Sequence, residues 1–471
     1  MTVVPEKATR SDEVVYNRPV DCDNHYYEKI DAFTRYLDPA FKDRGVEVIK
    51  RGKHTELLAG GKLLEFVPNP TFDPVIVPGA LDLLFRGQIP KGVDPRSLMK
   101  VEPLNPAYQD HDVRLEMIEQ QEMSGVILLP TLACGVEEAL KEDIPATMAS
   151  VTAFNTWLDE DWGYNYKGRI FSAPMLALAD PDEAVAEIDR LLERDVKLVY
   201  IRPAPVPAGH GTSRSLGDMR YDTVWAKLEE SGIPVAFHLS DSGYNGSIAR
   251  AWGAPARFVP FRTSNPLANI VVSDRAIHDT MASLILGGVF TRHPKLRVAS
   301  IENGSDWVQL LVKRLKKQAN QTPWAFAEPP VDTIRRHLWV APYYEDDVRA
   351  LADLVGSDRV LFGSDWPHGE GLEKPTDFVK ELGDFDEGEK DRIMRTNVLD
   401  YLGSLPVAEC RMGALVSPGE CTHANPVSAD VYFARDERVV AFFALLFAAG
   451  SSCSRRRLVY SRMQLSPYSK L

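Results

Sequence analysis

The chain has 471 residues, of which 44% are hydrophobic, and a formal net charge of −13 at pH 7. This length fits one large domain with additions, because α/β barrels reach about 250 residues before insertions. The acidic balance argues against a nucleic-acid surface, which would need clustered Lys and Arg. Five scattered cysteines match neither a disulfide framework nor a paired zinc motif, which favours a reducing compartment.

Targeting and membrane signals are missing from the sequence pattern. The first residues lack the basic stretch and apolar core of a secretory signal, and the longest apolar run, residues 439–450, is shorter than the roughly 20 residues of a membrane span. From these patterns we expect a cytoplasmic protein whose partners are neither a nucleic acid nor a membrane.

The N-terminal part begins with a polar lead, residues 1–18, and a first apolar strand, residues 19–25. Residues 29–110 do not show alternating strand and helix patterns. Glu47–His54 and Leu63–Val67 have the pattern of hairpin strands, and a Pro- and Gly-rich segment follows. An insertion directly after the first strand would lie over the open end of a barrel. We therefore predict that residues 29–110 form a cap over the site.

Beyond the insertion, strand and helix patterns alternate regularly. Helical patterns cover residues 113–122, 181–193, 221–231 and 305–317. Including the first strand, eight apolar strands are predicted, at residues 19–25, 125–130, 169–174, 196–202, 234–238, 296–302, 338–342 and 359–364. Buried parallel strands read as continuous apolar runs, so the pattern predicts a (β/α)8 TIM barrel at residues 19–403. A doubly wound open sheet is the alternative, although no glycine-rich phosphate loop follows any strand.

The C-terminal part differs in composition from everything before it. From residue 406 onward it carries eight Lys or Arg against five acids, and three of the five cysteines. We predict that residues 404–471 form a poorly ordered extension that does not belong to the barrel.

Acids and histidines stand at the ends of several of the predicted strands. They are Asp23 and His25 at the end of the first strand, His238 at the end of the fifth, Glu302 at the end of the sixth and Asp365 at the end of the eighth. Each alone has a structural alternative, such as a turn, a helix cap or a buried core histidine. Together they favour one divalent ion such as zinc or manganese, because the carboxyl ends of parallel strands meet at one edge and mixed His and carboxylate ligands suit such ions.

Three segments resemble the amidohydrolase-related family: Asp21–Glu28, the stretch from Phe290 to Gly304, and Leu361–His368. The resemblance spans roughly residues 15–403 and is greatest to the branch with aminocarboxymuconate semialdehyde and aromatic-acid decarboxylases. It implies a TIM barrel with a mononuclear metal site whose ligands are Asp23, His25, His238 and Asp365.

This chain departs from the family pattern at two positions, Asp23 and Glu302. The family often has a histidine where Asp23 stands, and a strand-six histidine where Glu302 stands. Acid-for-histidine exchange occurs at the first position among decarboxylase-like members, so Asp23 stays in the ligand set. For Glu302 three roles stay open: it is a ligand, it orients a ligand, or it binds the substrate by a hydrogen bond.

The resemblance implies non-oxidative decarboxylation of a small aromatic or semialdehyde carboxylic acid, with Asp365 and His238 as catalytic residues. Asp365 would give a proton to the carbon that loses carbon dioxide, while Arg202 pairs with the carboxylate and His368 contacts the substrate. One alternative is metal-dependent hydrolysis of an amide, lactone or C–C bond, in which Asp365 takes a proton from water. Another is an inactive barrel that serves as a binding module. We expect a small-molecule carboxylate substrate and a homodimer.

Overall fold

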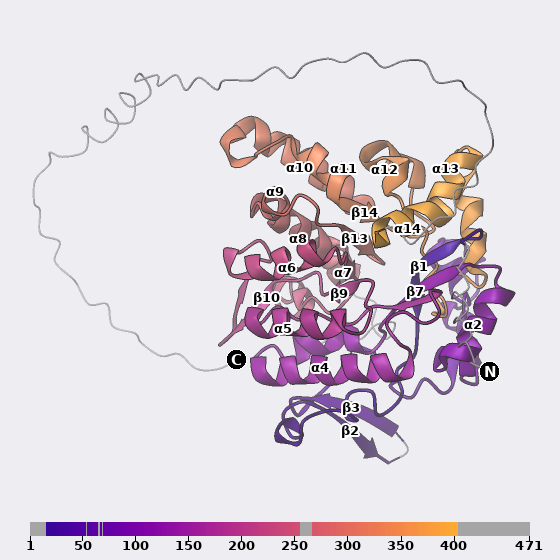
Figure 1. Cartoon of the computed structure of the whole chain (residues 1–471). Coiled ribbons are helices and arrows are strands. Elements are labelled where there is room, and N and C mark those ends of the chain that lie inside the picture. The colour runs from indigo at the N-terminus through magenta and orange to yellow at the C-terminus, as the bar shows by residue number, and fades with distance from the viewer. Residues whose placement is uncertain (1–15, 53, 65, 68, 255–265, 404–471) are drawn as a thin grey trace, which may run out of the picture. The chain divides into compact units, whose positions relative to one another are not determined.

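The computed structural model describes residues 16–52, 54–64, 66–67, 69–254 and 266–403 (Figure 1). Most of the predicted polar lead, and the whole predicted extension at residues 404–471, lie outside the described residues. The described part is a mixed α/β structure with two parallel sheets. Within it, no helix combines the length and apolar character needed to cross a membrane.

The parallel strands follow the predicted apolar runs. One sheet has the order β1 (Val20–His25), β7 (Gly125–Leu129) and β8 (Ile170–Ser172). The other has the order β14 (Leu338–Val340), β13 (Val298–Ile301), β12 (Val235–His238) and β9 (Val199–Ile201). All residues of these strands are buried, as expected of a sheet covered on both faces.

Backbone contacts connect the two sheets at both edges. Beyond β8, Met175 forms a parallel bridge with Tyr200 of β9. At the other edge Val340 of β14 bridges Val360, and Asn24 of β1 bridges Trp366. Residues 360–366 therefore lie between β14 and β1, in the place predicted for the eighth strand.

The prediction of a regular strand at residues 359–364 is wrong. Ser357–Arg359 form a short 3-10 turn, and the following residues pair through single bridges and hydrogen bonds, such as Asp365 N to Asp23 O at 2.8 Å. The chains come very close here, since a Cβ on Gly363 would lie 2.7 Å from the Asp23 Cβ. The backbone at Gly363 therefore lies against Asp23 of β1, and Asp365 has a positive φ. Residues in this arrangement do not continue a regular ladder of β-sheet hydrogen bonds.

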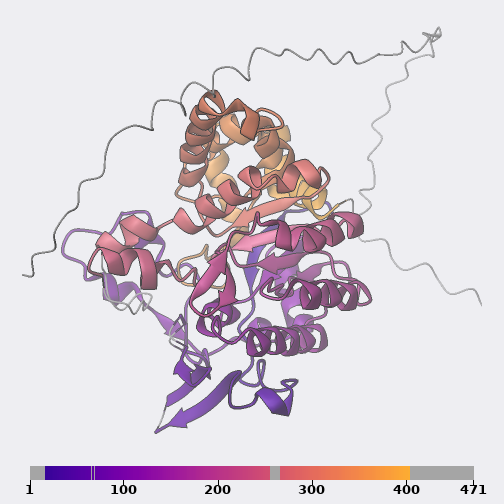
Figure 2. The same cartoon turned by 90° about the vertical axis from the view of Figure 1, so that its left-hand side faces the viewer.

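Helices cover the parallel strands, and α4, α5 and α6 lie in a row along one side (Figures 1 and 2). The α-helices are α1 (Asp82–Phe85), α2 (His111–Gln120), α3 (Val136–Ala139), α4 (Ile144–Asp161), α5 (Pro181–Leu192), α6 (Asp222–Ser231), α7 (Pro266–Val272), α8 (Arg275–Leu286), α9 (Val289–Arg292), α10 (Asp306–Gln321), α11 (Pro330–His337), α12 (Val348–Val355), α13 (Glu387–Asp391) and α14 (Asn397–Leu402). Local sequence explains α5: Asp180 caps it by accepting from two backbone N–H groups, and Pro181 starts it. The apolar face of α5, with Ala184, Ile188 and Leu191, is buried in the core.

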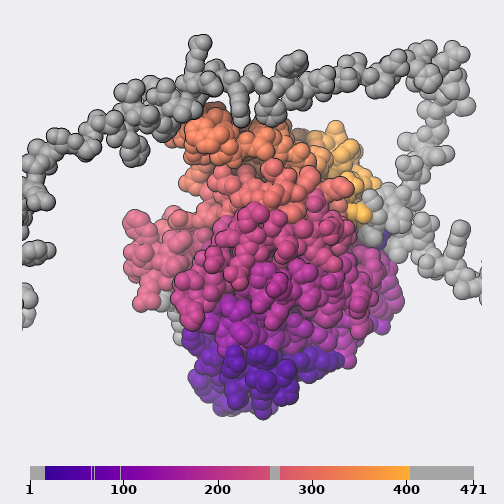
Figure 3. Space-filling view, turned by 60° about the vertical axis from the view of Figure 1, so that its left-hand side comes forward, coloured from indigo at the N-terminus to yellow at the C-terminus, as the bar shows by residue number. Residues whose placement is uncertain are grey.

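The segment at residues 29–110 contains antiparallel strands rather than βα units. They are β2 (Val46–Arg51), β3 (His54–Ala59) and β4 (Lys62–Leu63) in one sheet, and β5 (Val75–Ile76) with β6 (Val101–Glu102) in another. The predicted stretch Glu47–His54 is in fact split by a turn at Gly52, so the hairpin forms earlier than expected. In the space-filling view the indigo segments, which include β2 and β3, lie at one end of the described part of the chain (Figure 3). A small hairpin of β10 (Val206–Gly209) and β11 (Thr212–Arg214) follows β9.

Candidate metal centre

Four predicted site residues converge at the carboxyl ends of the parallel strands. Asp23, His25, His238 and Glu302 each offer one ligand atom, and these atoms lie within 4.8 Å of one another. His25 Nε2 lies 3.3 Å from Asp23 Oδ1, and His238 Nε2 lies 2.8 Å from Glu302 Oε2. Residues from β1, β12 and the end of β13 thus meet at one point, as the strand-end pattern predicted.

Asp365 joins the same group through His25. Its Oδ1 lies 3.3 Å from His25 Nε2 and 2.6 Å from His368 Nδ1. His25, Asp365 and His368 form a second set of mutually close ligand atoms, and the rings of the two histidines are 4.1 Å apart. The structure therefore brings Asp365 and His368 to the edge of the four-residue group.

Several ligand atoms in this group are buried without a hydrogen bond among the described residues. They are Asp23 Oδ1, His25 Nε2 and His238 Nε2. Buried polar atoms are nearly always satisfied, so unsatisfied donors and acceptors that converge on one point indicate a missing partner. Two imidazoles and two or three carboxylates are a donor set that suits zinc or manganese, and the residues therefore fit a divalent ion.

Glu302, which follows β13, and Asp365 have unusual backbone conformations. Glu302 has φ 55° and Asp365 has φ 56°, a left-handed conformation that is uncommon for residues other than glycine. Neighbours hold both in place: the Tyr343 hydroxyl donates to Glu302 O at 3.0 Å, and Asp365 N donates to Asp23 O. Backbone strain of this kind clusters at functional sites, where it aims a side chain that a relaxed strand would not.

Burial and neighbouring charges set the protonation of the site. Burial, helped by the charge of His368, lowers the pKa of His25 to about 4, so at neutral pH its imidazole is neutral and can bind an ion. Burial opposes ionisation of Asp23, but the neighbouring imidazoles of His238 and His25 outweigh this effect and lower the pKa of Asp23. Burial raises the pKa of Asp365 well above its usual range, although His368 acts in the opposite direction.

The sequence patterns did not predict a buried polar network next to the site. The carboxylate of Asp21 accepts from Ser364 N at 3.0 Å, from Ser364 Oγ at 2.6 Å and from Asn24 Nδ2 at 2.8 Å. Arg114, fully buried on α2, donates to Asn24 Oδ1 and to His25 O. The signal in the sequence was Asp21, an acid inside the predicted apolar first strand, because a buried carboxylate needs hydrogen-bond partners.

The segment at residues 29–110 contacts residues of the site. Phe72 stacks on Tyr27 with 4.2 Å between ring centroids, and Tyr27 in turn stacks on His368 at 5.7 Å. Gly79 N donates to His368 O, and Leu81 N donates to Gly369 O at 2.8 Å. Residues 72–81 therefore contact the loop that carries His368.

The guanidinium group of Arg202 is already bonded to other groups of the protein. It is buried, and it donates to Glu138 Oε2 at 2.8 Å and to the carbonyl oxygens of Asp241 and Pro205. Glu137 lies at 3.6 Å. This arrangement is that of a structural ion pair, and the substrate-binding role of Arg202 stays a prediction.

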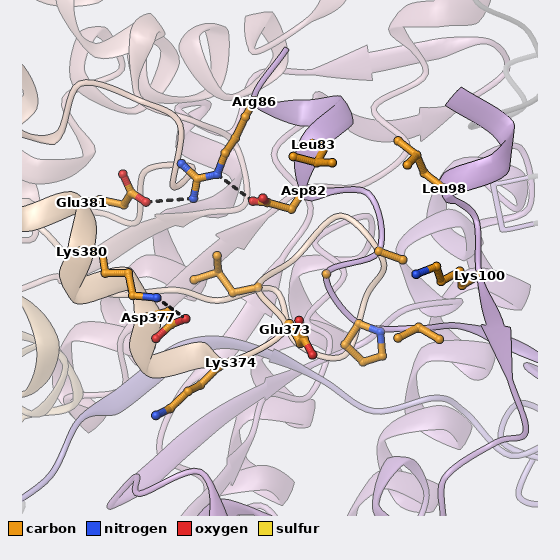
Figure 4. Close-up of a pocket in the computed structure, with 15 residues that line it drawn as sticks. Asp82, Leu83, Arg86, Leu98, Lys100, Glu373, Lys374, Asp377, Lys380 and Glu381 are labelled. Atoms are coloured by element: carbon orange, nitrogen blue, oxygen red, sulfur yellow. Dashed lines mark hydrogen bonds and ion pairs between the residues drawn. The ribbon is translucent and has the colours of Figure 1, made fainter. Parts of the chain in front are cut away.

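A separate cavity of about 480 Å³ lies between residues 77–100 and 372–381 (Figure 4). Five of its charged side chains pair with one another: Arg86 with Asp82 and Glu381, and Lys380 with Asp377. In the described part of the chain, none of the predicted site residues lines it. This cavity therefore adds nothing to the metal centre.

Comparison with known proteins identifies the family. The amidohydrolase family profile matches residues 93–402, which is well over half of the chain. The chain belongs to the amidohydrolase family. The relationship predicted from the three sequence segments is confirmed, and the family indicates a metal-dependent enzyme of the amidohydrolase superfamily.

One solved relative matches most of this chain. The crystal structure of an amidohydrolase from Mycobacterium avium subsp. paratuberculosis K-10 is 57% identical, with a TM-score of 0.78, over 82% of this chain and 99% of its own. The apo form of the IDCase of Metarhizium anisopliae, 18% identical with a TM-score of 0.51, covers 82% of this chain and 97% of its own, and supports the fold alone.

Two curated relatives are named as decarboxylases. The 2-amino-3-carboxymuconate-6-semialdehyde decarboxylase of Dictyostelium discoideum is 28% identical over 131 residues, which are 27% of this chain and only 36% of that enzyme. The gamma-resorcylate decarboxylase of Rhodococcus jostii (strain RHA1) is 24% identical over 303 residues, which are 61% of this chain and 85% of that enzyme.

Proposed function

We propose that this protein is a metal-dependent carboxy-lyase that removes carbon dioxide from a small aromatic or semialdehyde carboxylic acid. The observation that carries the proposal is the set of unsatisfied ligand atoms of Asp23, His25 and His238, with the acid Asp365 beside them. The names of the two curated relatives, an aminocarboxymuconate semialdehyde and a resorcylate decarboxylase, support this choice of reaction.

The proposed framework is a (β/α)8 barrel at residues 19–403, with residues 29–110 as a cap. The bridges Met175–Tyr200, Val340–Val360 and Asn24–Trp366 support closure of the two sheets into one ring. The stack of Phe72 on Tyr27 supports a cap that shapes the entrance. Active sites of such barrels lie at the carboxyl ends of the strands, where this metal centre lies.

In the proposed site Asp23, His25, His238 and Asp365 would hold one divalent ion, zinc or manganese, with Glu302 as a further candidate. When bound, the ion supplies Lewis-acid polarisation of the substrate's oxygens. Burial keeps His25 neutral, and burial also raises the pKa of Asp365, which favours the protonated form that a general acid needs. Asp365 would then pass that proton to the carbon that carries the leaving carbon dioxide.

Hydrolysis is a second candidate, and Glu302 favours it. Its carboxylate places a third acid beside Asp23 and Asp365, which disfavours an anionic substrate. Arg202, the basic residue predicted to offset that charge, is already paired with Glu138. A neutral amide, lactone or ketone would meet no such repulsion, and Asp365 or Glu302 would take a proton from the attacking water.

Isotope labelling separates the two reactions. The zinc- or manganese-loaded chain would be screened with hydroxylated aromatic acids, unsaturated semialdehyde acids, lactones and amides. Under the proposal, an active acid releases carbon dioxide, and in heavy water the product carries deuterium on the carbon that lost it. An active substrate that takes up labelled oxygen from water and releases no carbon dioxide would instead establish a hydrolase.

A further inference from the structure

The turn that follows β7 contacts two histidines of the site. Thr131 Oγ1 lies 3.1 Å from His368 Nε2, and Cys134 Sγ lies 3.8 Å from His238 Nδ1. Both contacts join residues more than 100 positions apart in the chain, and no pattern in the sequence marks the turn as part of the site.

The hydrogen bonds of Thr131 decide which nitrogen of His368 carries a proton. The Thr131 hydroxyl donates to Tyr26 O at 2.9 Å, and a carbonyl oxygen can only accept. A hydroxyl has one proton, so toward His368 the same oxygen must accept. His368 Nε2 must therefore be the donor, and the ring carries a hydrogen on Nε2.

The other ring nitrogen then faces the acid of the site. His368 Nδ1 lies 2.6 Å from Asp365 Oδ1. Two acceptors without a proton would repel at this distance, so one proton lies between the two atoms. With Nε2 held by Thr131, the ring cannot turn over without breaking both bonds, and Asp365 always meets Nδ1.

Glu28 holds the turn in place. Its Oε1 accepts from three successive backbone N–H groups, those of Thr131 at 3.1 Å, Leu132 at 2.8 Å and Ala133 at 3.1 Å. Glu28 itself is buried, with 1% of its surface exposed. A turn fixed by three bonds to one buried carboxyl group leaves the Thr131 hydroxyl little freedom.

We propose that Thr131 is a positioning residue for the reaction: by accepting the Nε2 hydrogen of His368 it holds that ring with Nδ1 and a shared proton against Asp365. The inference rests on the proposed role of Asp365 as the proton donor. A threonine with a structural role alone would need only its bond to Tyr26 O. The second bond, to a ring that contacts Asp365, is what links the turn to the chemistry.

Three variants of the full chain test this inference. Thr131→Val keeps the side-chain volume and removes the hydroxyl, whereas Thr131→Ser keeps the hydroxyl. The matched control is Thr147→Val, because Thr147 is buried on α4 and its hydroxyl bonds only backbone carbonyls, including Leu140 O at 2.9 Å. Thermal melts would establish that each variant is folded.

Two measurements follow on each folded variant, prepared with ¹⁵N-labelled histidine. The first is the exchange rate with water of the His368 Nε2 hydrogen, whose signal is assigned by its loss in His368→Gln. The second is the dissociation constant for zinc, measured by competition with a chelator. Neither measurement needs a substrate.

In Thr131→Val the exchange of the Nε2 hydrogen should be about two- to tenfold faster, the factor for loss of one hydrogen bond. Zinc binding should weaken by about tenfold, the effect known for residues that do not contact the ion but orient the residues around it. Thr131→Ser and Thr147→Val should match the unsubstituted chain. The inference is overturned if Thr131→Val leaves the exchange rate unchanged, or if Thr131→Ser is impaired as much as Thr131→Val.

Failure of the proposed function would look different. A chain that binds no zinc would overturn the metal centre, yet the exchange rate in the zinc-free chain would still decide the role of Thr131 toward His368. Conversely, normal zinc binding with an exchange rate indifferent to Thr131→Val would remove the inference and leave the metal centre intact.

Discussion

His238 Nε2 lies 2.8 Å from Glu302 Oε2 at the meeting point of β12 and the end of β13. Burial alone would lower the pKa of His238, but the carboxylate beside it raises that pKa well above the usual value. The carboxylate of Glu302 thus favours a proton on the His238 imidazole, in the position that a divalent ion would take. Binding of an ion at this centre must displace that proton.

Replacing His238 by Ala should lower the bound zinc or manganese per chain and abolish turnover, while the fold is kept. The reason is the loss of one of two imidazole ligands, each of which contributes directly to the affinity. Metal content would be measured by elemental analysis, beside a thermal melt. His293→Ala is a control of the same kind away from the centre, since His293 pairs with Asp222. Full occupancy in His238→Ala would show that the ligand assignment is wrong.

Zinc affinity of the unsubstituted chain should fall as the pH is lowered from 8 to 5.5. The raised pKa of His238 means that a proton competes with the ion for Nε2 over this range. Calorimetric titration in two buffers with different heats of ionisation would measure the protons released on binding. Binding without proton release would contradict the ion pair of His238 with Glu302.

The substitution Glu302→Gln tests the open role of that acid. If Glu302 helps to hold the ion or its ligands, zinc affinity should weaken by roughly 10- to 100-fold, the range known for residues that orient ligands. Glu116→Gln, on an exposed position of α2, is the matched control. Unchanged zinc affinity with altered substrate preference would instead assign Glu302 to substrate binding.

Asp365→Asn should reduce turnover far more than substrate binding. The amide keeps the size of the side chain but cannot pass on a proton, and general acid assistance contributes roughly 10²–10⁴-fold. Steady-state kinetics on samples of known metal content would separate loss of the acid from loss of the ion. Normal turnover with normal metal content would exclude a proton-transfer role for Asp365.

Glu28 predicts a pH dependence of stability. Burial raises its pKa from 4.5 to about 7, despite the N–H bonds from Leu132 and its neighbours. The folded chain thus holds this proton more tightly than the unfolded chain, so the contribution of Glu28 is greatest below about pH 4.5 and falls as the pH rises to about 7. The full fall corresponds to roughly 3 kcal/mol.

The substitution Glu28→Gln removes that titration. Relative to the unsubstituted chain it should gain stability between pH 5 and pH 8, by up to roughly 3 kcal/mol, as measured by urea unfolding of the metal-free protein. Glu116→Gln should show the same stability difference at both pH values. A stability difference for Glu28→Gln that is independent of pH would mean that Glu28 does not titrate in this range.

The sequence by itself determined the order of the buried strands and the residues that end them. Continuous apolar runs and helical periodicity are local signals, so they predicted β7 and α5 to within a few residues. The strand-end pattern also predicted that His25, His238 and Glu302 would meet, because parallel strands present their carboxyl ends at one edge.

Only the tertiary structure decided which atoms face each other. Asp365 lies 3.3 Å from His25, 340 positions away, and Thr131 bonds His368 across 237 positions. Arg202 had the right chemistry for a substrate anchor, yet Glu138 and the carbonyl of Pro205 surround it. Such pairings depend on loop paths and side-chain rotamers, whose energies are set by long-range packing and which no local period in the sequence encodes.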